Sequence, residues 1–70
     1  MLNKVMAASK MITVDGVDGF HSAAAIVGKD MATAMLIMQL KIKLNPDHRY
    51  PEPDDVPDRI EEILMQNEIL

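Results

Sequence analysis

Apolar side chains recur at helical spacing along most of this chain. In residues 2–12 they lie three or four positions apart, which favours a short helix. The stretch Met11–Val14, taken alone, could also form a short strand, but the helix is favoured. The segment Asp15–Gly19 follows, and its two Asp-Gly pairs predict a turn. Its resemblance to an EF-hand calcium loop fails, because later ligand positions of that loop hold Val17, Gly19 and Ile26.

Residues 22–44 predict one long, apolar central helix. They contain no proline and five alanines, with Ser22 or Asp18 as the expected N-cap and Asn45-Pro46 as the stop. In one alternative the helix breaks at Gly28 and Asp30 caps a second piece. In another, residues 36–44 form a strand, because apolar and polar residues alternate there from position 38.

This predicted helix is apolar on two sides. One stripe contains Met31, Met35 and Met38, and Leu36 and Leu40 fall on a roughly opposite arc. A second copy of the chain is the simplest cover for the side that the chain itself leaves open. The expected homo-oligomer interface comprises Val27, Met31, Met35, Met38, Leu36 and Leu40. A methionine stripe is also typical of core packing, of an adaptable partner groove or, rarely, of a soft-metal site.

The last part of the chain has a different pattern. All four prolines fall in residues 45–57, which predicts an extended, stiff connector. Residues 56–70 predict an amphipathic helix, capped by Asp55, with acids near its start. Its predicted apolar face contains Val56, Ile60, Ile63, Leu64 and Leu70, whereas Met65 and Ile69 fall on the acidic side.

Composition favours a single small all-α domain that assembles with itself. Seventy residues without cysteine can bury only a modest core, yet 49% of them are apolar. The uncharged run Met31–Leu40 is about half the length that spans a bilayer, and the N-terminus lacks the pattern of a secretory signal. We therefore expect a cytoplasmic protein without membrane contact.

Charge divides the chain into two parts. Residues 1–44 hold five lysines and three aspartates, net +2, whereas residues 45–70 hold two arginines and eight acids, net −6. No basic cluster predicts direct nucleic-acid binding. The acidic part is either a solvated face or a surface for a basic partner protein. The residues expected to bind that partner are Asp54, Asp55, Asp58, Glu61, Glu62, Met65 and Ile69.

Candidate chemistry is sparse. His21 and His48 are the only imidazoles, and they fit no ligand or catalytic spacing, so we predict no enzyme activity, no metal and no cofactor. The stretch Asp47–Tyr50 holds the only tyrosine. Either Tyr50 packs the connector onto the long helix, or His48, Arg49 and Tyr50 bind an anionic or nucleotide-like ligand between subunits.

Two functional hypotheses follow from these patterns. The first is a non-enzymatic oligomeric regulator or inhibitor that binds a larger protein through its acidic C-terminal part. The alternative is a small-ligand-binding protein whose pocket forms between subunits at His48, Arg49 and Tyr50.

Overall fold

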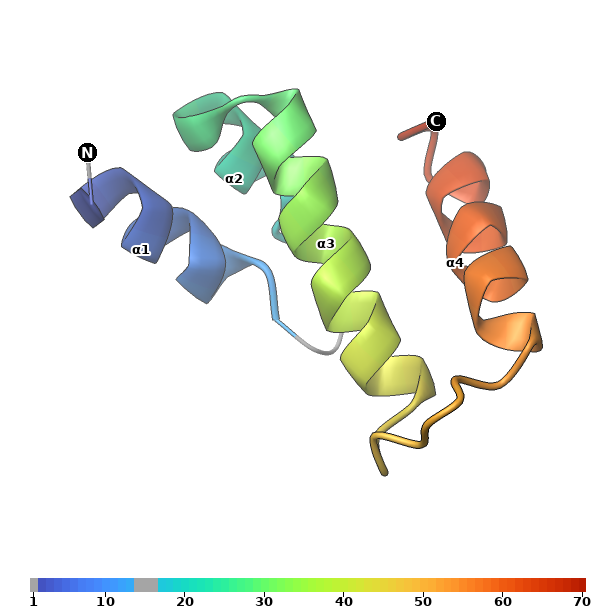
Figure 1. The fold of residues 1–70 in the computed structure, drawn as a ribbon. Coiled ribbons are helices and arrows are strands. Elements are labelled where there is room, and N and C mark those ends of the chain that lie inside the picture. Colours follow the sequence, from blue (N-terminus) through green and yellow to red (C-terminus); the bar gives the residue numbers. More distant parts are fainter. Residues whose placement is uncertain (1, 14–16) are drawn as a thin grey trace.

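The computed structural model describes residues 2–13 and 17–70, and within them helices are the only regular secondary structure. Four helices follow one another: α1 (Leu2–Met11), α2 (Phe20–Val27), α3 (Lys29–Leu44) and α4 (Asp55–Gln66). Figure 1 shows α3 in the middle, with α1 and α2 on one side and α4 on the other. The described residues contain no strand, so the strand alternative for residues 36–44 is wrong.

The turn before α2 depends on a close approach between two backbones. Phe20 donates its backbone N–H to the carbonyl of Val17 at 3.0 Å. A β-carbon at Gly19 would overlap the main-chain carbonyl of Met11, so only glycine allows the chain to pass the end of α1 here. Asp15 and Gly16, which belong to the predicted turn, lie outside the described residues.

The predicted continuous helix over residues 22–44 is wrong, because the chain breaks at Gly28. This glycine has φ 95° and ψ 152°, a region of backbone space that is essentially restricted to glycine. The helix before the break starts at Phe20, with Gly19 rather than Ser22 or Asp18 at its N-cap. Asp30 lies in the first turn of α3 and makes no capping hydrogen bond.

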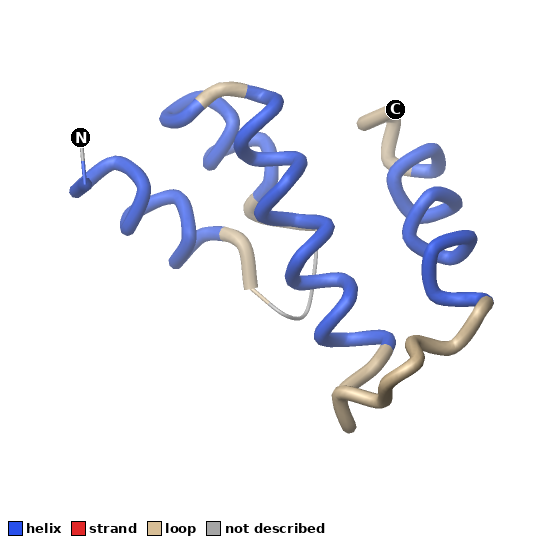
Figure 2. Tube along the Cα trace, viewed as in Figure 1, coloured by secondary structure: helices blue, strands red, loops and turns tan. Residues whose placement is uncertain are grey.

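Helix α3 ends where the sequence predicts, and a long loop then leads to α4 (Figure 2). Asn45 is the C-cap of α3, and Pro46 follows it. Asp54 rather than Asp55 is the N-cap of α4, again without a side-chain hydrogen bond. Pro57 is the third residue of α4, in the turn whose backbone N–H groups have no partner within the helix.

Helix α4 ends four residues earlier than predicted, and its end has the geometry of a Schellman motif. Glu68 adopts φ 58°, and the backbone N–H of Ile69 donates to the carbonyl of Leu64 at 2.8 Å. The N–H of Glu68 donates to the carbonyl of Met65 at 3.1 Å, which completes the motif. The reversal carries Ile69 back against the core.

One apolar core joins the four helices. Each helix contributes the positions that face its neighbours, and α4 packs on α3 with three residues one turn apart. Ile12, Leu36, Leu40 and Val56 are the largest side chains that are fully buried. The core consists of Ala8, Ile12, Phe20, Ala23, Ala32, Leu36, Leu40, Val56, Ile60, Leu64 and Ile69.

Candidate functional site

Helix α3 exposes an apolar face opposite its core-facing side. The side chains of Met31, Met38 and Ile42 are 47%, 65% and 41% exposed. At about 100° per residue these positions lie roughly opposite Leu36, which is fully buried. Single exposed apolar residues are common, but a row along one helix face is typical of a binding surface. We call this face the outer stripe; it consists of Met31, Ala34, Met38 and Ile42, with Met35 half-buried at its edge, where it also packs against the core.

Two predicted interface residues do not belong to this face. Leu36 and Leu40 pack in the core of their own chain and are therefore not available to a second copy. The prediction mixed the two sides of α3, since a helix apolar on both sides does not reveal which side its own chain covers. Ala34 and Ile42 take their place, and their spacing from Met31 on the helical wheel is the signal that finds them.

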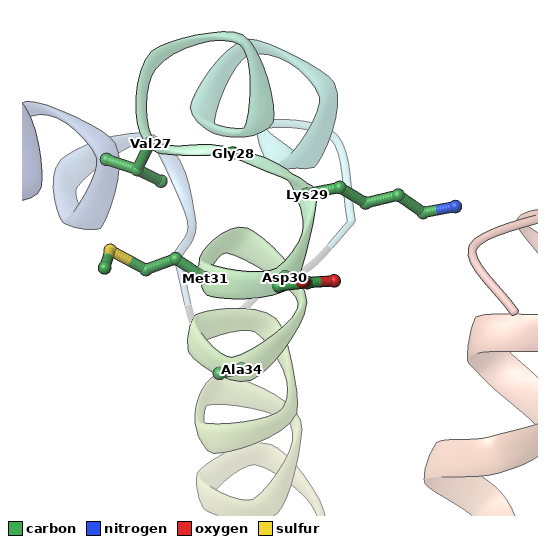
Figure 3. Close-up of a pocket in the computed structure, with 6 residues that line it drawn as sticks. All are labelled: Val27, Gly28, Lys29, Asp30, Met31 and Ala34. Carbon is green, nitrogen blue, oxygen red and sulfur yellow. The ribbon is translucent and has the colours of Figure 1, made fainter.

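A hollow lies at the N-terminal end of the outer stripe (Figure 3). In this view the side chains of Val27 and Met31 point to one side of α3, and those of Lys29 and Asp30 point to the other. The hollow has a volume of about 690 Å³ and is lined by Val27, Gly28, Lys29, Asp30, Met31 and Ala34.

A smaller hollow extends the same surface onto α1. It has a volume of about 220 Å³ and is lined by Lys4, Val5, Ile26, Val27 and Met31. Val27 and Met31 are common to both hollows, so the apolar surface is continuous from α1 across the break at Gly28 and along α3. Val5 and Ile26 were not predicted as site residues.

The outer face of α4 has a different chemistry. Asp58, Glu61 and Glu62 are exposed on the side of the helix that points away from its buried residues. Met65 lies among them on the helical wheel and is 59% exposed, as the sequence predicts. We call this surface the acidic face; it consists of Asp55, Asp58, Glu61, Glu62 and Met65, with Asp54 exposed at its start.

One predicted partner-binding residue is wrong. Ile69 is only 3% exposed, because the chain reverses at Glu68 after the end of α4. Leu70, which was placed on the buried side, is instead 69% exposed. Both errors come from continuing the helical pattern past Gln66, where the helix stops.

The loop between α3 and α4 displays the predicted ligand-binding residues. The side chain of Asn45 makes two hydrogen bonds to the backbone of Arg49. The Oδ1 of Asn45 accepts from the N–H of Arg49 at 3.1 Å, and the Nδ2 of Asn45 donates to the carbonyl of Arg49 at 3.2 Å. His48 has φ 52°, in the left-handed region. Tyr50 is 99% exposed, so it does not pack the connector onto α3. Neither hollow described above reaches this loop.

The two histidines lie on different elements, both exposed. His21 is in α2, where its ring meets that of Phe20 edge to face with centroids 5.4 Å apart. Within residues 2–13 and 17–70, no three His, Asp or Glu side chains are grouped so that they could hold a metal ion. Across the same residues, no helix is both long and apolar enough to cross a membrane.

In comparisons with known proteins, no protein-family model, curated protein or solved structure matches this chain.

Proposed function

We propose that this chain is a non-enzymatic interaction protein, a regulator or inhibitor that associates with itself and binds a larger protein. The observation that carries the proposal is the outer stripe, an apolar row on α3 that the core leaves exposed. A chain of 70 residues gains stability when a partner covers such a surface.

The acidic face is the surface proposed for the second protein. Glu61 and Glu62 lie one turn before the exposed Met65, and Asp58 lies two turns before it, so an apolar contact is combined with neighbouring negative charge. Charged rims speed the encounter with a partner of opposite sign, and the partner expected here presents lysines or arginines around an apolar patch.

Charge reversal tests this part of the proposal. The variant Glu61→Lys/Glu62→Lys changes two exposed carboxylates that lie beyond the first turn of α4, so it spares the acids that favour the helix dipole. The matched control, Asp18→Lys/Asp47→Lys, makes the same change in net charge at exposed positions outside α4. Each protein is immobilised and used to capture binding proteins from a cell lysate. The captured proteins are then quantified by mass spectrometry.

The acidic face is supported when a bound protein is retained by the wild type and by the control but lost by Glu61→Lys/Glu62→Lys. Equal capture by all three proteins would remove the acidic face from the mechanism.

The loop at Asp47–Tyr50 favours a second candidate function, the binding of an anionic or nucleotide-like ligand. A non-glycine residue in the left-handed region is costly, and such residues concentrate at functional sites; His48 is one of them. A thermal-shift screen against anionic metabolites and nucleotides separates the two functions. A ligand at 100 times its dissociation constant stabilises the fold by about 2.7 kcal/mol, and that gain disappears in Arg49→Ala when the loop is the site.

A further inference from the structure

We infer that the outer stripe is a two-fold dimer seam in which α3 runs antiparallel to α3 of a second copy. The inference rests on the proposed self-association and specifies its geometry. Three independent features of α3 lead to it: the spacing of the stripe, the charges at its ends and the hollow beside Met31.

The spacing of the stripe is that of a coiled-coil seam. Met31, Met35, Met38 and Ile42 are separated by four, three and four residues, so they keep one line along the helix. Met35 is the half-buried member of this line and also packs against the core of its own chain. The line is about 16 Å long at about 1.5 Å per residue. Ala34 adjoins it, and a small side chain at that place lets another helix approach closely.

The charges at the two ends of α3 select the orientation. Asp30 in the first turn and Lys41 in the last turn are both exposed. They lie about 20° apart around the helix, on the flank that Ala34 occupies. A parallel two-fold pair carries this flank to opposite sides of the seam, so it forms no contact between Asp30 and the partner's Lys41. An antiparallel pair places Asp30 beside the partner's Lys41 at both ends of the seam.

The hollow accounts for the end of the seam. In an antiparallel register, the midpoints of the two outer stripes can lie opposite each other. Met31 then faces the partner's Ile42, and Met35 faces the partner's Met38. The hollow lined by Val27, Met31 and Ala34 then receives the side chain of the partner's Ile42. Two-fold symmetry repeats this contact at the other end, so one hollow per chain is sufficient.

Cysteine cross-linking tests the orientation directly, since the natural chain contains no cysteine. Two single variants are made, Met31→Cys and Ile42→Cys, and one of them carries an affinity tag. The antiparallel seam predicts that the mixture forms a disulfide-linked dimer about tenfold faster than either variant alone, because the cysteines are close only across the two different positions. A parallel seam predicts the reverse.

Charge exchange tests the end contacts. Asp30→Lys and Lys41→Asp, each alone, are expected to raise the dimer dissociation constant about tenfold, and the double variant is expected to restore it. The double variant carries both charges against the helix dipole, so restored dimerisation does not reflect a more stable helix. Lys43→Asp, on the other side of the last turn, is the matched control and should leave the dissociation constant unchanged.

Sedimentation equilibrium of the wild type is measured alongside these variants. Dimers that show the mixed cross-link and the restored double variant support the seam. Dimers that cross-link otherwise, or that do not respond to charge exchange, overturn the seam but leave the proposed self-association standing. A wild type that stays monomeric up to millimolar concentration overturns both.

Discussion

Helices α3 and α4 lie side by side, but their apolar residues are distributed differently around the helix axis. In α4 the apolar positions Val56, Ile60 and Leu64 face the core, and the opposite side is acidic apart from Met65. In α3 the side facing the core is apolar, and so is the side facing away from it. A helix with one apolar face is covered by its own chain, whereas α3 has a second apolar face that the described part of the chain leaves exposed.

The largest expected effect separates the two sides of α3. Leu36→Ala removes a fully buried side chain and should lower the free energy of unfolding by about 2–5 kcal/mol, a large part of the stability expected for 70 residues. Met38→Ala removes a side chain that is 65% exposed and should change the stability of the monomer by only about 0.5 kcal/mol. Urea denaturation at low protein concentration measures both values.

The comparison would fail if both substitutions destabilised the monomer equally, because the outer side of α3 would then contribute to the intramolecular core. The same two variants are expected to reverse their order in a self-association assay, provided that Leu36→Ala is measured at a temperature where it remains folded.

The next effect concerns the break that fixes where α3 begins. Gly28→Ala forces a β-carbon onto a residue with φ 95° and ψ 152°, so the free energy of unfolding should fall by about 1–3 kcal/mol even though the space around the position is open. Thermal unfolding followed by circular dichroism provides the measurement. A rise of about 1 kcal/mol, as expected for Gly→Ala inside a helix, would instead indicate that residues 22–44 form one continuous helix, and the outer stripe would lose its hollow.

The smallest effect is a gain at the end of α4. Glu68 occupies the position of the Schellman motif that usually holds glycine, so Glu68→Gly should raise the free energy of unfolding by about 0.5–1 kcal/mol. Glu68→Ala is the control, since it removes the carboxylate but keeps the cost of the left-handed backbone. If the two variants are equally stable, the gain comes from charge, and the backbone of Glu68 is not strained.

The all-α class was predictable because the apolar spacing is helical on every long segment. The choice between one helix and two at Gly28 was open, since an isolated glycine is tolerated inside a helix and only the backbone angles show that it is not inside one here. The face of α3 that its own chain covers was equally hidden, because both sides carry apolar residues. That choice depends on where α2 and α4 pack, which is a property of the tertiary structure.

The C-terminal residues show the same limit in a different form. The helical-wheel prediction for Met65 is correct because Met65 lies inside α4. The predictions for Ile69 and Leu70 are wrong because the rotation of about 100° per residue no longer applies after Gln66. Asn67 is a recognised helix stop signal, but the left-handed residue is Glu68, and a glutamate in that region is not expected from sequence. The contact between Ile69 and the core therefore became visible only in the structure.

The molar mass in solution, measured by light scattering over a wide concentration range, tests the central claim most directly. We predict that the wild type rises to twice the chain mass of 7.8 kDa, whereas Met38→Lys, which places a charge in the middle of the outer stripe, keeps the mass of a single chain. A wild type that stays at 7.8 kDa at every concentration, or a Met38→Lys variant that dimerises equally well, would contradict the assignment of the outer stripe as the self-association surface.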